Sequence, residues 1–215
     1  MTNTRYAIYY APEPATALAE FGQRWLDELG PANCPDAVAA PRRYGFHATL
    51  KAPFRLAADR DAGQLETGMA EFARRKMPFS APALLLAELD GFLALRPAAS
   101  TRMLGALAED CLRSFDHFRA PATADELRQR GVGLDLRQAE LLACWGYPYV
   151  LDQYRFHLTL TGRLDDDTRG RLRALLEPLT AIVADQPLAV ESICLFVQPT
   201  ADEAFRLRRR FPLGG

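Results

Sequence analysis

The sequence contains one pattern twice. Residues 43–56 read RYGFHATLKAPFRL and residues 153–164 read QYRFHLTLTGRL, so Tyr-x-Phe-His-x-Thr-Leu returns after 110 positions. The chain has only three histidines, and two of them, His47 and His157, occupy this pattern. A repeated unit usually packs about a pseudo-twofold axis, which brings its equivalent strands face to face. The pattern therefore predicts two related halves that meet at a shared site.

Each copy of the pattern has the alternation of a β-strand, in which every second residue faces the same side. The apolar faces are core-like and consist of Tyr44, Phe46, Ala48 and Leu50 in the first copy and Tyr154, Phe156, Leu158 and Leu160 in the second. The opposite, polar faces carry His47, Thr49 and Lys51 in the first copy and Arg155, His157, Thr159 and Thr161 in the second. Each strand is thus expected to present an imidazole, a hydroxyl and a cation on one side.

The rest of the chain alternates between strand and helix patterns. Up to the hairpin we expect a strand at 5–11, a helix at 16–29 that Gly30-Pro31 ends, a loop before the first motif, a helix at 60–76 and a hairpin at 83–97 about Asp90-Gly91. Between the hairpin and the second motif we expect a helix at 100–118 capped by Ser or Thr, a short helix with loops within 119–134, a helix at 135–145 and a turn. After the second motif we expect a helix from 166 to about 184 and two final strands. This order predicts an α+β fold with two antiparallel-rich sheets around a central cleft and helices on the outside. We expect one bilobal domain over 1–215, with approximate halves 1–118 and 119–215.

A second, shorter similarity supports a duplication. LALRP at 93–97 and LFVQP at 195–199 are 102 positions apart, close to the spacing of the histidine motifs. Each would be a strand that follows the helix after its own histidine strand. We therefore expect these two segments to be equivalent in the two halves.

Composition places the chain among ordinary globular proteins. It has 215 residues, 49% of them hydrophobic and 25% charged, with a formal net charge of -1. This balance gives no overall attraction to nucleic acid or to an anionic membrane, so anion binding requires a local group of cations. The N-terminal residues lack a signal-peptide pattern, no apolar run is long enough to span a membrane, and the four cysteines form no C-x-x-C pair. We expect a cytoplasmic protein whose cysteines are reduced, small and buried.

The two polar faces supply the groups that phosphoester chemistry needs. One neutral histidine can take a proton from water or a ribose hydroxyl while a protonated one gives a proton to the leaving oxygen, because the ordinary histidine pKa of about 6.5 allows both states near neutral pH. The hydroxyls of Thr49 and Thr159, with the cations Lys51 and Arg155, could hold the phosphate oxygens. This scheme requires no metal ion and no organic cofactor.

The paired tetrapeptides HATL (47–50) and HLTL (157–160) resemble the signature of the 2H phosphoesterase superfamily. The segments YAIYYAP, GFLALRP and CWGYPYV, together with the extended motifs, resemble a bacterial branch of it that is associated with phosphonate metabolism, over nearly the whole chain. The resemblance implies a bilobal fold and metal-independent cleavage of cyclic phosphates or 2′-5′ phosphodiesters. It implies catalytic roles for His47 and His157 and phosphate-binding roles for Thr49 and Thr159.

Other residues are weaker candidates for the site. Equivalent positions in the shorter similarity suggest Arg96 and Gln198 as cleft residues, and Tyr44 and Tyr154 could stack a base or sugar, although packing explains most aromatic residues. The third histidine, His117, has no partner motif and is interpreted as structural. The basic run RLRRR (206–210) fits the outward face of an edge strand that charge protects from aggregation.

The sequence therefore predicts a metal-independent phosphodiesterase that acts on a small cyclic phosphate of a nucleotide or phosphorylated ribose. Processing of 2′-5′ linkages or RNA ends is the enzymatic alternative, although RNA is not favoured as a partner by the near-neutral charge. A non-catalytic phosphate-binding or RNA-binding module would not need both histidines. A metalloenzyme fits least, because neither motif has H-E-x-x-H or clustered carboxylates.

Overall fold

The computed structural model describes residues 4–99 and 102–214. Its strands are β1 (Arg5–Tyr10), β2 (Ala48–Phe54), β3 (Phe79–Ala81), β4 (Leu84–Leu89), β5 (Phe92–Pro97), β6 (Leu158–Thr159), β7 (Leu188–Val190), β8 (Ser192–Gln198) and β9 (Arg206–Pro212). Its α-helices are α1 (Ala17–Arg24), α2 (Gly30–Asn33), α3 (Pro35–Tyr44), α4 (Ala62–Arg74), α5 (Arg102–Phe115), α6 (Ala124–Arg130), α7 (Leu136–Trp145) and α8 (Asp166–Ala184). A π-helical turn, Trp25–Leu29, joins α1 to α2, and 3-10 turns occupy Asp116–Phe118 and Leu151–Gln153.

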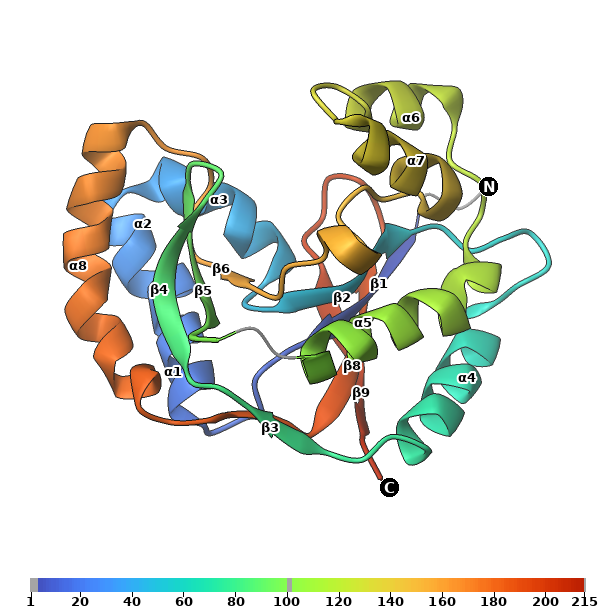
Figure 1. Ribbon diagram of the computed structural model, residues 1–215, viewed down its shortest axis with the longest axis horizontal. Coiled ribbons are helices and arrows are strands. Elements are labelled where there is room, and N and C mark those ends of the chain that lie inside the picture. Colours follow the sequence, from blue (N-terminus) through green and yellow to red (C-terminus); the bar gives the residue numbers. More distant parts are fainter. Residues whose placement is uncertain (1–3, 100–101, 215) are drawn as a thin grey trace.

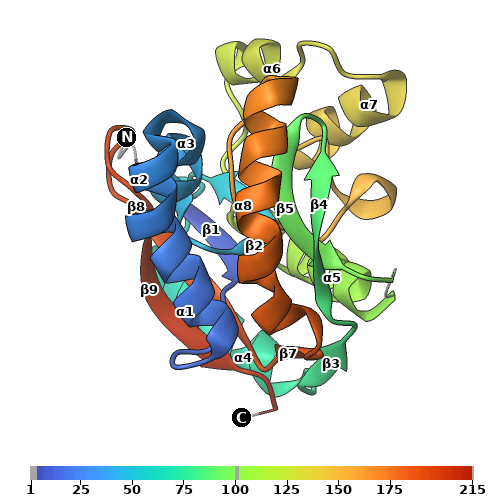
Figure 2. The same ribbon diagram turned by 90° about the vertical axis from the view of Figure 1, so that its left-hand side faces the viewer.

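The molecule is an α+β protein built on two antiparallel sheets, as the sequence predicted. One sheet has the strand order β2-β1-β8-β9 and the other has the order β4-β5-β6, while β3 pairs with β7 between them. Figure 1 shows the two sheets side by side, with α1 and α8 outside one and α4 outside the other. Figure 2 shows α8 running along the outer side of β4 and β5. No helix in residues 4–99 and 102–214 is long and apolar enough to cross a membrane.

The element order repeats once along the chain. The series β1, helices, β2, α4, β3, β4 is followed by the series β5, helices, β6, α8, β7, β8, and β9 is an addition at the end. Each sheet combines the first and histidine-bearing strands of one series with the last strand of the other, because β1 pairs with β8 and β5 pairs with β4. In this order the second series begins after the Asp90-Gly91 turn, earlier than the division near residue 119 that the sequence suggested.

This arrangement corrects the predicted equivalence of LALRP and LFVQP. LALRP lies in β5, which is hydrogen-bonded directly to β6, the strand of the second histidine motif. LFVQP begins within β8, and β1 separates β8 from β2. The strand of the first series that is equivalent to β5 is therefore β1. The similarity of the two pentapeptides does not mark equivalent positions.

The segment before the first motif is helical where the sequence predicted a helix end and a loop. Gly30 does not stop the helix, because its N–H bonds the carbonyl of Trp25 across a π-turn and the chain continues into α2. Prolines then begin and interrupt α3: Pro35 lies in its first turn and Pro41 lies inside it. Pro35 costs little at the helix start because the N–H there has no helical acceptor. Pro41 has no N–H for the carbonyl of Ala37, which accepts from Gly162 instead.

The remaining elements agree with the expected periodicities. Leu65, Met69 and Phe72 of α4 are buried as predicted, and α8 has the predicted bounds. Asp90 and Gly91 adopt φ values of 45° and 87°, the left-handed conformation that a tight hairpin turn requires. The predicted cap of α5 at Ser100 or Thr101 lies outside the described residues.

The cysteines are all free, but they are not all buried. Cys111 and Cys194 are buried as predicted, and Cys34 is partly buried. Cys144 is exposed, in the last turn of α7. The prediction of small buried thiols is therefore wrong for Cys144.

Candidate active site

The two histidines have the same local geometry. Each lies immediately before a strand, His47 before β2 and His157 before β6, rather than within it. The Nδ1 atom of His47 is 2.8 Å from the carbonyl oxygen of Gly45, and Nδ1 of His157 is 2.7 Å from that of Arg155. A carbonyl oxygen can only accept, so Nδ1 carries the proton in both rings and Nε2 is left for a ligand.

The surroundings of His47 are aromatic and favour its neutral form. Its ring stacks on Tyr9 with centroids 3.8 Å apart, and its Nε2 is 3.4 Å from the hydroxyl of Thr49. Burial, and to a smaller extent the charge of His157, lower the pKa of His47 from 6.5 to about 4, although the Gly45 carbonyl acts in the opposite direction. The coupling to His157 indicates that the two imidazoles lie in one electrostatic environment.

The surroundings of His157 contain charges of both signs. Burial lowers the pKa of His157, the carbonyl of Arg155 raises it, the Arg155 guanidinium lowers it and Asp90 raises it. Its ring also contacts Phe92, with centroids 5.6 Å apart. A carboxylate therefore favours the protonated form of His157, whereas none is among the groups that shift the pKa of His47.

The lowered pKa of His47 predicts a stability that falls in acid. Between the unfolded pKa of 6.5 and the folded pKa of about 4, the unfolded chain binds more protons at His47 than the folded protein does. The contribution of neutral His47 to the free energy of unfolding is therefore fully present above about pH 7 and decreases as the pH falls toward 4. When the pH is lowered from 7.5 to 4.5, we expect the free energy of unfolding to fall by about 2 kcal/mol less in His47→Gln, whose amide can still bond Gly45, than in the parent protein. Urea midpoints at the two pH values measure this difference, and equal losses in both proteins would contradict it.

A cavity of about 530 Å³ lies between the two motifs. Its walls include Thr49 from the first motif and Arg155 and His157 from the second, and His47 adjoins it through Thr49. The hydroxyl of Tyr154, also in the wall, donates to the carbonyl of Thr49 at 3.0 Å and ties the two motifs together. The cavity volume is in the range of small-molecule sites. The geometry therefore brings the two motifs to one hollow, as the duplication predicted.

Two of the predicted residues lie beside this cavity without lining it. Thr159 is partly buried in β6 and pairs with Ala94 of β5. Thr49 has the equivalent position in β2, where it pairs with Tyr9 of β1. Tyr44 is the last residue of α3 and stacks on Phe205, with its ring 6.2 Å from that of His47. Tyr44 thus belongs to a helix, and the predicted alternation of side-chain faces applies only to residues after it.

Lys51 is a correction to the predicted site. Its side chain is 2% exposed, and its Nζ donates to Asp116 at 2.9 Å, away from the cavity. The cause is a bulge in β2, where Thr49 and Lys51 pair with the consecutive residues Tyr9 and Ile8 of β1. A bulge turns the following side chains to a different face. Lys51 is thus part of the protein interior, not a phosphate ligand.

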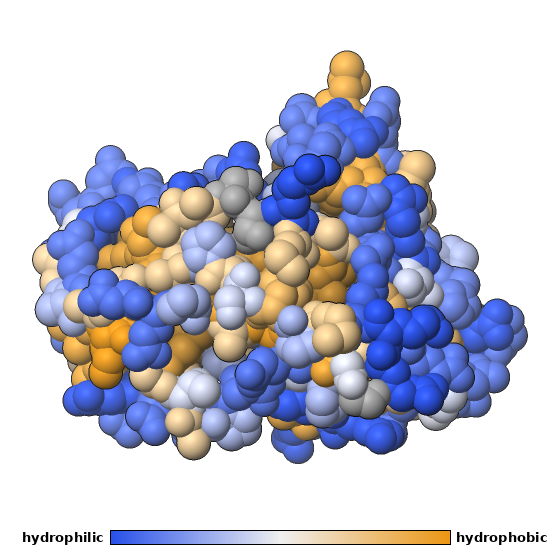
Figure 3. All heavy atoms as spheres, turned by 60° about the horizontal axis from the view of Figure 1, so that its bottom comes forward, coloured by the Kyte–Doolittle hydropathy of each residue, from blue (hydrophilic) through white to orange (hydrophobic). Residues whose placement is uncertain are grey.

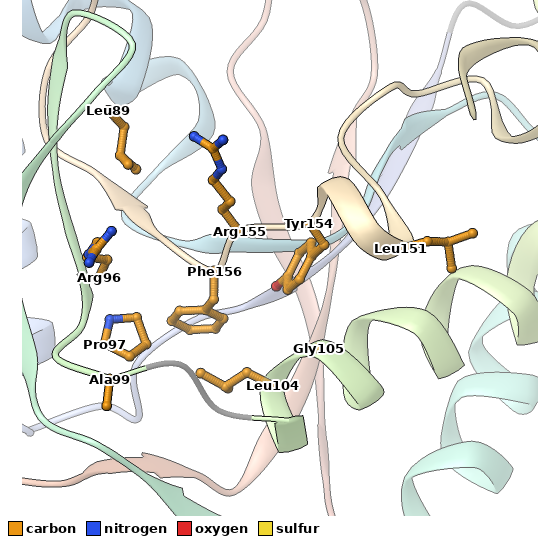
Figure 4. A pocket seen from close by; sticks show the side chains of 10 residues that line it. All are labelled: Leu89, Arg96, Pro97, Ala99, Leu104, Gly105, Leu151, Tyr154, Arg155 and Phe156. Atoms are coloured by element: carbon orange, nitrogen blue, oxygen red, sulfur yellow. The ribbon is translucent and has the colours of Figure 1, made fainter. Parts of the chain in front are cut away.

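Gln198 is also a correction, whereas Arg96 lies in a hollow. Gln198 is fully buried at the far end of β8, where its Oε1 accepts from Arg5 and its amide donates to Glu203. Arg96 is exposed and lines a smaller hollow of about 300 Å³. Figure 4 shows this hollow, in which Arg155 and the ring of Phe156 leave the chain in opposite directions. The two hollows share Leu89, Tyr154 and Arg155 in their walls.

Sequence reasoning missed several residues in the wall of the larger cavity. Tyr147 and Tyr149 form an edge-to-face pair there, and Gln138, Asp90 and Arg163 also line it. Tyr147, Tyr149 and Gln138 come from α7 and the segment after it. With α6, this part of the chain projects from the molecule (Figure 1, Figure 3). Val132 and Leu136 of this part are exposed. The motif GRL after the second HLTL was the only sequence signal for Arg163.

The basic run in β9 is accounted for by ion pairs. Arg208 and Arg209 both bond Glu66, Arg206 lies 3.5 Å from Glu203, and Arg210 bonds Glu13 at 2.8 Å. β9 is the edge strand of its sheet, as predicted. Arg210 is only 19% exposed, so the predicted outward face does not extend to it.

Comparison with known families assigns the chain to a group of proteins. A family model described as "Protein of unknown function (DUF1045)" matches residues 49–206, a range that contains Thr49 and the whole second motif. The chain belongs to the DUF1045 family. Within residues 4–99 and 102–214, no group of three or more histidine, cysteine, aspartate or glutamate side chains is arranged to hold a metal ion.

Relatives of this DUF1045 chain include two larger proteins. The ribose 1,5-bisphosphate phosphokinase PhnN of Laribacter hongkongensis (strain HLHK9) is 40% identical over 218 residues, which cover 95% of this chain and 51% of that protein. The protein of the same name from Janthinobacterium sp. (strain Marseille) is 35% identical over 232 residues, covering 99% of this chain and 51% of its own length. The chain therefore spans about half the length of the curated relatives it matches.

Solved structures with a similar course of the chain include the following two crystal structures. That of E. coli LigT with 3′-AMP has a TM-score of 0.48 and 16% identity, covering 98% of each chain. A second, described as a phosphoesterase, has a TM-score of 0.46 and 14% identity, covering 99% of this chain and 98% of its own.

Proposed function

We propose that this chain is a phosphodiesterase that hydrolyses a small cyclic phosphate, with His47 as general base and His157 as general acid. The observation that carries the proposal is the matched pair of Nδ1–carbonyl bonds, 2.8 Å and 2.7 Å long, at two histidines. His157 lines the cavity, and His47 lies 3.4 Å from the hydroxyl of Thr49 in its wall. A histidine held in this way presents Nε2 in a fixed direction, which a general acid or base requires. A binding module for phosphate would need hydroxyls and cations but no oriented imidazoles.

The proposed reaction is one displacement at phosphorus. Nε2 of His47 takes a proton from water, the water oxygen forms a bond to phosphorus, and the bond from phosphorus to one ring oxygen breaks. Nε2 of His157 gives its proton to that oxygen, which leaves as a hydroxyl. The hydroxyl of Thr49 and the guanidinium of Arg155, which line the cavity, hold the non-bridging oxygens, where charge increases in the transition state.

The assignment of acid and base follows from the charges near each ring. Burial lowers the pKa of His157 in the free protein, but Asp90 opposes that shift, and a bound negative phosphate acts in the same direction as Asp90. His47, stacked on Tyr9, keeps its neutral form and can accept a proton. Both roles are therefore available near neutral pH once substrate is bound.

A cyclic phosphate of phosphorylated ribose is the substrate class that we favour. Opening a 1,2-cyclic phosphate of ribose 5-phosphate at the 2-oxygen leaves phosphates on carbons 1 and 5. That product is ribose 1,5-bisphosphate, the compound in the name of the larger relatives that this chain matches over about half their length. The resemblance of the motifs to the branch associated with phosphonate metabolism supports a place in phosphonate breakdown.

A panel of substrates with chelator present tests this proposal. We expect turnover of a ribose cyclic phosphate that is retained in excess chelator and abolished in the double variant His47→Ala, His157→Ala. The panel should also contain 2′,3′-cyclic nucleotides and a 2′-5′ dinucleotide. Binding without turnover of any of them would contradict the proposal and favour a binding module, whereas activity lost in chelator would indicate a metal-dependent reaction.

A nucleotide substrate is the second candidate because of the aromatic wall. Tyr149 is 42% exposed, and its pair with Tyr147 faces the cavity, so a base could stack there. If the nucleotides in the panel were preferred, we would expect Tyr149→Ala to raise their KM by about tenfold and to leave kcat unchanged. An unchanged KM would exclude base stacking on Tyr149.

A further inference from the structure

The charge of the cavity wall is uneven between the two motifs. The arginines of the wall, Arg155 and Arg163, both belong to the second motif and the residues after it. The corresponding cation of the first motif, Lys51, is buried and paired with Asp116. The positive charge available to an anion is therefore concentrated on one side of the cavity, beside the Asp90-Gly91 turn.

The backbone of Arg163 is fixed on both sides. The N–H of Gly162 donates to the carbonyl of Ala37 at 2.6 Å, and the N–H of Leu164 donates to that of Gly91 at 2.9 Å. The Ala37 carbonyl is free for this bond because Pro41, four residues later in α3, has no N–H to offer it. The interruption of α3 thus anchors the segment that carries Arg163. A site on an anchored segment holds its ligand more accurately than one on a free loop.

The side chain of Arg163 is available for a ligand. It is exposed, and within residues 4–99 and 102–214 no carboxylate lies in ion-pair distance of it. Arg155, by comparison, has Asp90 at 4.0 Å, a long and exposed pair. An arginine that faces a cavity without a partner is suited to a phosphate group, which it can bind through two parallel N–H donors.

The two arginines have different neighbours within the same cavity wall. Leu158 pairs with Leu95, and Leu164 bonds Gly91, so the chain from His157 to Arg163 runs along β5 toward the turn. Arg155 lies near enough to His157 for its charge to lower the pKa of that imidazole. Arg155, which adjoins both His157 and Asp90, is therefore placed for the reacting phosphate, whereas Arg163 in the same wall is available for a further anionic group.

We infer that Arg163 binds a second phosphate of the substrate, a phosphomonoester that does not react. The substrate class is then a small cyclic phosphate that carries a further phosphate, as a cyclic phosphate of ribose 5-phosphate does. This inference rests on the proposed function for the position of the reacting phosphate. The anion site at Arg163 itself depends only on the cavity and its charge.

Kinetics with matched substrates test this site. For ribose 1,2-cyclic phosphate with a 5-phosphate, we expect Arg163→Gln to raise KM by about 10- to 100-fold, the usual effect of losing a charged hydrogen bond. For the same compound without the 5-phosphate, KM should not change. Arg163→Lys should recover part of the loss, and Arg171→Gln, an exposed arginine of α8 outside the cavity wall, is the control. Equal effects on both substrates, or no effect on either, would overturn the inference.

A binding measurement separates this inference from the proposed function. Ribose 5-phosphate cannot be hydrolysed by the proposed reaction, and its affinity can be measured by calorimetry. We expect its affinity to fall about tenfold or more in Arg163→Gln and to stay unchanged in Arg171→Gln. If no cyclic phosphate were turned over but this loss occurred, the proposed function would fail and the anion site would stand. Equal affinities for parent and Arg163→Gln would remove the site whatever the activity.

Discussion

Replacing His47 or His157 with alanine is expected to lower kcat by roughly 10² to 10⁴, the usual contribution of a general acid or base. Both variants should stay folded, because each ring is only partly buried and the carbonyl that its Nδ1 bonds can bond water instead. Initial rates on the preferred cyclic phosphate measure the effect, and circular dichroism and urea midpoints check the fold. Wild-type turnover in both single variants would show that neither ring takes part.

An activated ester distinguishes the acid from the base. A p-nitrophenyl phosphodiester has a leaving group that departs without a proton, so loss of the general acid should matter little with this substrate. We expect His157→Ala to recover most of its activity on the activated ester and His47→Ala to recover none. The opposite pattern would exchange the two roles. Equal losses in both variants would argue against a separate acid and base.

Replacing Lys51 with methionine is expected to lower the free energy of unfolding by about 3 kcal/mol, the low end for breaking a buried ion pair. The loss is at the low end because Arg119 still donates to both oxygens of Asp116, at 2.8 Å and 3.0 Å. KM should not change, because Lys51 faces the interior. Urea denaturation and steady-state kinetics on one sample measure both quantities.

Arg155→Met is the matched variant for Lys51→Met. The Arg155 side chain is 67% exposed and its pair with Asp90 is long, so its replacement should change stability little. It should raise KM, because Arg155 lines the cavity beside His157. A raised KM with unchanged stability in Lys51→Met would show instead that Lys51 reaches the substrate, as the strand alternation suggested.

The sequence predicted the features that depend on short-range pattern. The repeated Tyr-x-Phe-His-x-Thr-Leu located both histidines, because an identical context at both positions has no simple packing explanation. The apolar periodicity of α4 and α8 and the Asp90-Gly91 dipeptide predicted helices and a hairpin, since local geometry decides these elements. The α+β class followed from their order.

The features that the sequence did not predict depend on contacts between distant segments. Lys51 was assigned to the site by strict alternation, but a bulge against β1 turns it inward. Arg163 was not singled out, because its position depends on a carbonyl that Pro41 leaves free in another helix. The pairing of β1 with β8 joins segments from the two ends of the chain and could not be predicted from either half alone.

The exchange of strands between the two sheets has a consequence for synthesis on the ribosome. The chain emerges from its N-terminus, so β1 and β2 are made long before β8 and β9, which begin at Ser192 and Arg206. Until then one edge of β1 has no partner and can pair with other chains. The sheet β4-β5-β6 is complete as soon as β6 has been made. The lobe that holds His157 can thus assemble first, and the lobe that holds His47 closes last.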